Sequence, residues 1–191
     1  MGKMMIDLLD CHKMFLTPHL RKGGIAADFT MGNGHDTAWL SKAVYGGEDA
    51  PGRVYAFDVQ PHALESTAAR LKEEECPDNC ELILSSHSEA KKYIKEPICA
   101  GIFNLGWLPG TEKVLTTRRE TTLPAVADAI EMLESGGGLI VAVYPGHEEG
   151  RLEGEELTEM LSGYSRFKVC VSKFRIINSP TSPFFFLIEK K

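Results

Sequence analysis

Short apolar runs alternate with stretches of helical periodicity through most of the chain. Five runs are rich in Val, Ile, Leu, Phe and Ala and too short for helices, so they predict buried strands at 24–30, 53–58, 81–85, 98–104 and 138–144. The stretches around them repeat apolar residues three and four positions apart, which predicts helices at about 4–20, 36–45, 61–75, 121–134 and 155–161. This alternation predicts a parallel sheet covered by helices on both faces.

The end of the chain departs from this pattern. Strands are predicted at 167–176 and 184–189, and the segment between them, with two prolines at 180 and 183, is too short for a helix. The two strands must therefore pair as a hairpin, so the last strand runs antiparallel to the others. We expect a Rossmann-like, doubly wound α/β fold with a seven-stranded, mostly parallel sheet. The prediction is one domain over 1–191, including the N-terminal helical stretch.

Composition narrows the class of protein further. The chain has 191 residues, 43% hydrophobic and 25% charged, as in an ordinary globular domain. No apolar run approaches the roughly 18 residues of a membrane span. Asp7, Asp10 and Lys13 interrupt the place where a signal peptide would be apolar, so we expect a cytoplasmic location. The cysteines number five, and Cys76 and Cys80 lack a second ligand pair at zinc spacing, so we expect neither a disulfide framework nor a metal site.

Glycines and acidic side chains cluster after the first predicted strand, in the segment DFTMGNGHDT at 28–37. In a doubly wound sheet, the loop between the first strand and the next helix binds the nucleotide. Gly32 and Gly34 allow a sharp turn and a close approach to a ligand. The third glycine of the dinucleotide fingerprint is replaced by Thr37, which disfavours a nicotinamide cofactor.

The charges around this loop describe the ligand. Asp28 and Asp36 would suit an ammonium group and would repel a pyrophosphate. Asp58 ends the second predicted strand, where an acid can bind the hydroxyl groups of a ribose. A ligand with a ribose, a cationic amino acid and no phosphate is S-adenosylmethionine (SAM). Each aspartate could instead be structural, with Asp36 as a helix N-cap. An NAD(P)-linked oxidoreductase and a catalytically silent nucleotide-binding module stay open as alternatives.

Over nearly its whole length the chain resembles the class I SAM-dependent methyltransferases, whose last strand is antiparallel. In finer detail it is similar to a bacterial family described as rRNA methylases. The segments that carry this resemblance are DFTMGNGHDT (28–37), FNLGWLPG (103–110), YPGHEEG (144–150) and SPFFF (182–186). The resemblance implies methyl transfer from SAM to the wobble uridine of tRNA, from 5-aminomethyl-2-thiouridine to its 5-methylaminomethyl form. It also implies the tRNA anticodon region as partner. Methylation of rRNA or of a small molecule is the alternative.

Asn104, at the end of the fourth predicted strand, is the leading candidate for the chemistry. It resembles the first residue of the Asn-Pro-Pro-Tyr element of amino-directed methyltransferases, although Leu105 and Trp107 stand where that element has proline and tyrosine. Its oxygen would accept N–H hydrogens and favour the neutral, nucleophilic amine. His147 is a second catalytic candidate, as a proton acceptor, and His35 points to the same rim.

The position and charge of these loops, together with the resemblance, indicate further candidates. The candidate cofactor-binding residues are Asp28, Gly32, Asn33, Gly34, Asp36, Thr37, Asp58, Gln60, His87 and Asn104. The candidate substrate-binding residues are Trp107, which could stack on a base, and the cations Lys113, Arg118 and Arg119. Several of these have structural alternatives, such as a helix cap for His87 and a core position for Trp107.

The net charge of −6 speaks against nucleic acid only at first sight. Two acidic blocks, at 73–81 and 148–159, account for more than all of it, and the rest of the chain is net positive. Basic clusters remain at 91–95 and at 113–119, and the second directly follows the FNLGWLPG segment. RNA binding is therefore compatible with the charge pattern. Dimerisation would enlarge such a surface, so a homodimer is a further expectation.

Overall fold

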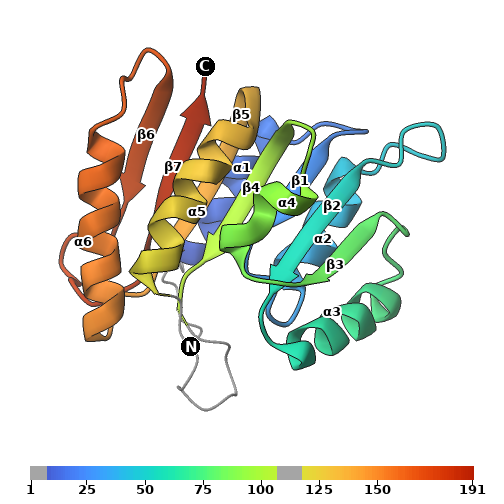
Figure 1. The fold of residues 1–191 in the computed structure, drawn as a ribbon, viewed down its shortest axis with the longest axis horizontal. Helices are drawn as coiled ribbons and strands as arrows, with labels where there is room; N and C mark the ends of the chain where they lie inside the picture. The colour runs from blue at the N-terminus through green and yellow to red at the C-terminus, as the bar shows by residue number, and fades with distance from the viewer. Residues whose placement is uncertain (1–7, 107–117) are drawn as a thin grey trace, which may run out of the picture.

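The computed structural model describes residues 8–106 and 118–191, which form one seven-stranded sheet with helices packed on it (Figure 1). The strands are β1 (Ile25–Asp28), β2 (Arg53–Asp58), β3 (Cys80–Leu84), β4 (Ile98–Asn104), β5 (Leu133–Val143), β6 (Val169–Phe174) and β7 (Phe184–Lys190). The helices are α1 (His12–Leu16), α2 (His35–Val44), α3 (Pro61–Glu73), α4 (Ala90–Tyr93), α5 (Arg119–Met132) and α6 (Glu148–Ser162), and the 3-10 helices are η1 (Leu8–Cys11), η2 (Thr17–His19) and η3 (His87–Glu89).

The strand order is β3-β2-β1-β4-β5-β7-β6. The pairs among β1 to β5 are all parallel, whereas β7 pairs antiparallel with both β5 and β6. The expected hairpin at the end of the chain is therefore confirmed, and β7 lies between its two partners. The doubly wound, Rossmann-like fold with an antiparallel last strand is also confirmed.

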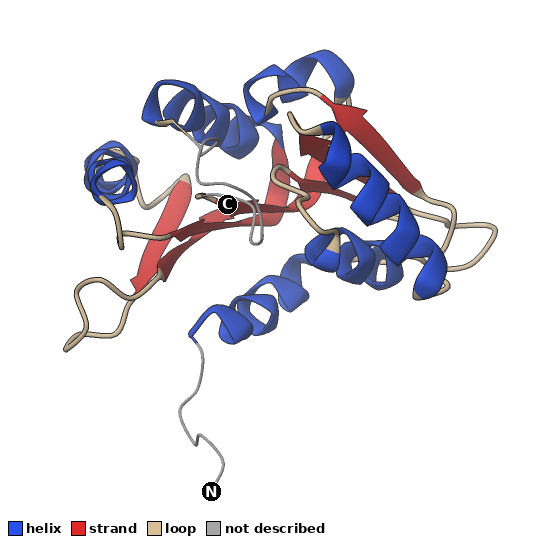
Figure 2. Cartoon of the chain, turned by 90° about the horizontal axis from the view of Figure 1, so that it is seen from below, coloured by secondary structure: helices blue, strands red, loops and turns tan. Residues whose placement is uncertain are grey.

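Two apolar clusters hold the helices on opposite faces of the sheet (Figure 2). One cluster joins α4, α5 and α6 to the strands and includes Phe103, Val126 and Leu157. The other joins α1 and α2 to the opposite face and includes Leu16 and Leu40. Strands buried on both faces explain why the central runs of the sequence are continuously apolar rather than alternating.

Several element bounds differ from the sequence-based expectation. The N-terminal helical stretch is divided into η1, α1 and η2. Pro18 has no N–H to donate to an α-helix and lies in the short η2 that follows α1. Strand β5 begins at Leu133, five residues before the predicted start at Gly138, and its pairing with β4 shifts register between Ile98 and Ala100. A Cβ on Gly137 would lie 2.9 Å from the carbonyl oxygen of Glu134, so a glycine fits this irregular crossing.

Further observations concern the cysteines, possible metal ligands and the length of the helices. All five cysteines are free thiols. Among the residues described, no cluster of three or more His, Cys, Asp and Glu side chains could hold a metal ion. None of the described helices is long and apolar enough to cross a membrane.

Candidate cofactor and substrate site

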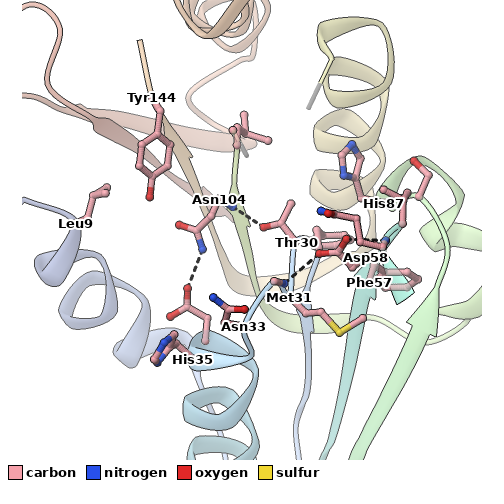
Figure 3. Close-up of a pocket in the computed structure, with 18 of the residues that line it drawn as sticks. Leu9, Thr30, Met31, Asn33, His35, Phe57, Asp58, His87, Asn104 and Tyr144 are labelled. Carbon is pink, nitrogen blue, oxygen red and sulfur yellow. Dashed lines mark hydrogen bonds between the residues drawn. The ribbon is translucent and has the colours of Figure 1, made fainter. Parts of the chain in front are cut away.

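A cavity of about 920 Å³ opens at the carboxyl ends of the parallel strands (Figure 3). The loops after β1, β2, β3, β4 and β5 all contribute to it, as expected for a doubly wound sheet. The N-terminal segment and the start of α5 contribute as well. The lining residues used below are Leu9, Asp10, His12, Lys13, Thr30, Gly32, Asn33, His35, Asp36, Phe57, Asp58, Val59, Gln60, Ser86, His87, Asn104, Gly106, Arg118 and Tyr144.

The glycine loop after β1, residues 29–34, is held by contacts with α3. Gly34 has φ +79°, and a Cβ there would lie 2.9 Å from three atoms of Thr67. The Thr67 hydroxyl donates to the carbonyl of Gly32 at 3.1 Å, and Arg70 Nε donates to the carbonyl of Asn33 at 2.6 Å. These contacts leave Gly32 and Asn33 on the cavity side, while Gly34 is buried beneath them and does not line the cavity.

Asp28 and Thr37 lie behind the loop instead of facing the ligand. Asp28 is fully buried, and its carboxylate accepts hydrogen bonds from the Thr37 hydroxyl at 2.7 Å and from the Thr30 backbone N–H at 3.2 Å. Burial, reinforced by the negative charge of Asp36, raises the pKa of Asp28. The expectation that Asp28 and Thr37 touch the cofactor is corrected here: neither lines the cavity, and both shape the loop from within.

Asp58 faces the cavity from the end of β2. One carboxylate oxygen accepts from the backbone N–H of Gly32 at 3.1 Å, and the other accepts from the backbone N–H of Gln60 at 3.0 Å (Figure 3). Each oxygen can accept a further hydrogen bond. Phe57 and Val59 add apolar surface on either side. Asp58 can therefore hold two hydroxyl groups next to the glycine loop.

His87 closes the same end of the cavity. Ser86, not His87, caps η3 by accepting the backbone N–H of Ser88. The His87 ring stands edge-on to Phe103, with ring centroids 5.6 Å apart. Burial lowers the pKa of His87 to about 4, against an opposing hydrogen bond to the backbone of Phe29, so the ring is neutral near pH 7. A neutral imidazole beside apolar surface suits a heterocyclic base.

Asn104 ends β4 at the centre of the cavity wall. Its backbone N–H donates to the Thr30 hydroxyl at 2.7 Å, and its side-chain Nδ2 donates to Asp36 Oδ2 at 2.8 Å (Figure 3). With the NH₂ group committed to a carboxylate, the side-chain oxygen is directed into the cavity. Figure 3 shows the hydroxyl end of Tyr144 directed toward the same region from the end of β5.

Asp36 is not the N-cap of α2 that was considered from sequence. The helix begins at His35, and Gly34 is the capping residue. The Asp36 carboxylate instead lies 2.8 Å from Lys13 Nζ and 3.6 Å from His12 Nε2. Burial alone would raise the pKa of Asp36, but hydrogen bonds and charge from His12 and Lys13 outweigh it and hold that pKa below its ordinary value.

The N-terminal segment is the part of the site that sequence reasoning missed. Leu9, Asp10, His12 and Lys13 all line the cavity. Their sequence shows a helical pattern and nothing that indicates a ligand. Thr30 and other cavity residues that follow strands could have been found, because side chains at the carboxyl ends of parallel strands converge at one edge.

Two candidates take structural roles. His147 is the N-cap of α6, where Nδ1 accepts the backbone N–H of Gly150 at 3.1 Å, and it does not line the cavity. That bond uses the lone pair that a proton acceptor would need, so the catalytic assignment of His147 is corrected to helix capping. Arg119 donates to Glu156 at 3.1 Å and lies 3.8 Å from Glu149. It ties α5 to α6 and is not free for substrate.

Of the remaining substrate candidates, one lies among the described residues and two do not. Arg118 is exposed and lines the cavity mouth. Trp107 and Lys113 lie outside the described residues, in the segment that joins Gly106 to Arg118. His35 is exposed on the cavity rim.

The sheet order, the antiparallel last strand and a cavity over the glycine loop define the class I methyltransferase fold. Residues 54–190 match the model of the family described as "Putative rRNA methylase", and the chain belongs to this family.

Similar proteins and structures agree with that placement. The chain is 35% identical over 181 residues to the Arabidopsis thaliana protein named "tRNA (mnm(5)s(2)U34)-methyltransferase, chloroplastic"; the match covers 90% of this chain and 65% of the length of the plant protein. A "putative rRNA-methylase" structure from Clostridium thermocellum superposes with a TM-score of 0.92 at 35% identity, covering 99% of this chain and 100% of that one. A "putative methyltransferase" structure from Streptococcus mutans, in complex with SAH, superposes with a TM-score of 0.86 at 36% identity, covering 98% and 100%.

Proposed function

We propose that the chain is a SAM-dependent RNA methyltransferase that N-methylates the 5-aminomethyl group of the tRNA wobble uridine, turning aminomethyl-2-thiouridine into methylaminomethyl-2-thiouridine. The observation that carries the proposal is the Asn104 side-chain oxygen, directed into a nucleotide-sized cavity beside the glycine loop. Membership of the rRNA methylase family and the name of the plant relative support it.

The cavity fits SAM better than a cofactor with phosphates. The loop at 29–34 contains no lysine or arginine, and the carboxylate of Asp36 stands in the first turn of α2, where a pyrophosphate would bind. Asp58 offers two carboxylate oxygens at the position of a ribose, and the neutral His87 faces the place of an adenine. Gly32, Asn33 and Gln60 complete the proposed cofactor site.

When bound, SAM supplies a methyl group on a sulfonium, which is a strong electrophile. The residues of this chain therefore have to orient the acceptor amine for in-line attack and keep its lone pair free. An alkylamine in water is protonated near neutral pH, with a pKa of about 10 on the lysine scale. The Asn104 oxygen accepts an N–H hydrogen of the neutral amine, and Leu9 and Tyr144 exclude water from one side of the cavity.

The RNA would approach over the segment between Gly106 and Arg118. Arg118 is an exposed cation at the cavity mouth and can contact a phosphate. Trp107 and Lys113 belong to the same segment, and we propose that they contact the anticodon region, with Trp107 stacked on a base. A cytoplasmic location and a homodimer stay predictions; the plant relative is named as chloroplastic. Light scattering of the purified chain tests the dimer.

Mass spectrometry of nucleosides tests the activity. The protein and SAM are incubated with tRNA carrying 5-aminomethyl-2-thiouridine, with the same tRNA carrying unmodified uridine, and with ribosomal RNA. We expect one added methyl group on the aminomethyl nucleoside and none elsewhere. Methylation of ribosomal RNA alone, or binding of NADH in place of SAM in calorimetry, would refute the proposal.

The Asn104→Ala variant tests the mechanism. Because Asn104 is expected to touch the amine, the variant should lose most methyl transfer at saturating SAM and keep its affinity for S-adenosylhomocysteine, the product form of the cofactor. Unchanged turnover would remove Asn104 from the reaction. A parallel loss of cofactor affinity would instead make Asn104 a cofactor ligand.

A further inference from the structure

Asp36, in the wall of the cavity, contacts side chains of two other segments of the chain. Its Oδ2 accepts from Asn104 Nδ2 at 2.8 Å, and its Oδ1 pairs with Lys13 Nζ at 2.8 Å. His12 Nε2 lies 3.6 Å from the same Oδ1. The Asp36 side chain is 13% exposed, so these contacts are largely shielded from water.

This arrangement fixes which end of the Asn104 amide the substrate meets. The NH₂ end is held by the carboxylate, and a flipped amide would place its oxygen against Asp36 Oδ2, two acceptors in contact. A carboxylate that accepts from the NH₂ group also polarises the amide and strengthens its oxygen as an acceptor. The oxygen of Asn104 is therefore the end presented to the cavity, as Figure 3 shows.

Both oxygens of Asp36 already have partners within the protein. Lys13 holds one, and Asn104 holds the other. Lys13 also lies 5.3 Å from the centre of the Trp39 ring, which restrains the ammonium group from a second side. The carboxylate is therefore built into the wall of the site, and Lys13 lies against it as a counter-charge.

We propose that Asp36 is a positioning residue which, anchored by Lys13, holds the Asn104 amide so that its oxygen alone faces the methyl acceptor. The site thereby selects an acceptor that carries N–H hydrogens, such as a primary amine, over one that has only lone pairs to offer. Asp36 acts through Asn104 and not through the cofactor. The turnover measurement that tests this proposal rests on the proposed function, whereas the orientation of the Asn104 amide can be measured without turnover.

Nuclear magnetic resonance of the ¹⁵N-labelled chain tests the orientation. The side-chain NH₂ signals of Asn104 are assigned by their loss in Asn104→Ala. In the native chain we expect them to exchange slowly with water, and in Asp36→Ala we expect this protection to be lost. Asp128→Ala is the matched control, because it removes a carboxylate from an ion pair with Lys91, at 2.6 Å, outside the cavity. Protection that survives in Asp36→Ala overturns the proposal.

Binding and turnover separate positioning from cofactor binding. We expect Asp36→Ala to bind S-adenosylhomocysteine within about twofold of the native affinity and to lose at least about tenfold in kcat. Asp36→Asn, whose amide oxygen can still accept from Asn104, should recover part of that kcat. A drop in S-adenosylhomocysteine affinity equal to the drop in kcat would mean that Asp36 binds the cofactor directly, and would overturn the proposal. If the native chain methylates no aminomethyl nucleoside, the proposed function fails, and the exchange measurement still decides the role of Asp36.

Discussion

Alanine substitutions at Gly34 and Gly136 separate the cost of a left-handed backbone conformation from the cost of a steric clash. Gly34 has φ +79° and lies against Thr67, whereas Gly136 has φ +81° and no atom within 4 Å of a built Cβ. An alanine in the left-handed region costs roughly 1–2 kcal/mol, and the stiffer unfolded chain returns about 0.5 kcal/mol. Gly136→Ala should therefore destabilise the fold by about 1 kcal/mol.

The same change at Gly34 adds a steric cost. The new Cβ would lie 2.9 Å from the Cα, Cγ2 and Oγ1 atoms of Thr67, so the glycine loop or α3 must shift. Inserting a methyl group into a packed contact costs roughly 1–3 kcal/mol, which brings the expected total to about 2–4 kcal/mol. Urea unfolding followed by circular dichroism measures both variants. Since Gly32 and Asn33 would move with the loop, the affinity for S-adenosylhomocysteine should fall in Gly34→Ala alone.

Equal unfolding free energies for the two variants would refute the steric reasoning. The double variant Gly34→Ala with Thr67→Ala supplies a second check. Removing the two side-chain atoms of Thr67 leaves one of the three close contacts, so part of the steric cost should be recovered. No recovery would place the cost in the backbone conformation.

Three further predictions follow from the site. Asp58→Ala removes the acceptor of two backbone N–H groups and of the proposed ribose, so calorimetry should show at least about tenfold weaker binding of S-adenosylhomocysteine, and unchanged binding would contradict the role. The pKa of His87 is lowered to about 4 in the folded chain, so the free energy of unfolding should fall as the pH drops from 6.5 through 4, by about 3 kcal/mol in total. Urea unfolding at pH 7 and at pH 4.5 measures this fall, and the His87→Leu variant should not show it. Arg118→Ala should raise the KM for tRNA and flatten its salt dependence, whereas Arg119→Ala, which breaks contacts to α6, should change neither; equal effects would remove the distinction between them.

The strands of this fold could be predicted closely, and the reason is their burial. The predicted bounds 53–58 and 98–104 agree with β2 and β4, because strands covered on both faces read as continuous apolar runs between polar ends. Helix α6 was expected to start at about residue 155 and begins at Glu148. Its cap is a histidine, which is not among the usual capping residues, so the residue types alone do not indicate where the helix begins.

The site was predictable where it depends on the ends of strands, and not where it depends on packing. Asp58 and Asn104 are the last residues of β2 and β4, and both line the cavity. Asp28 ends strand β1 in the same way, but it is buried, and burial of one polar residue cannot be read from its neighbours in sequence. The ion pair between Lys13 and Asp36 joins residues that only the packing of α1 against the sheet brings together.

Because β7 runs antiparallel to β5, the last residues of the chain lie at the amino ends of the parallel strands, and the first described residues lie at their carboxyl ends. Lys190 ends β7 beside Val169, at the end of the strands away from the cavity (Figure 1). Leu8 begins the 3-10 helix η1, whose next residues line the cavity. For immobilising or labelling this protein, the carboxyl terminus is the attachment point that keeps the cavity accessible. A linkage introduced at Leu8 would instead lie next to Leu9 and Asp10, which line the cavity.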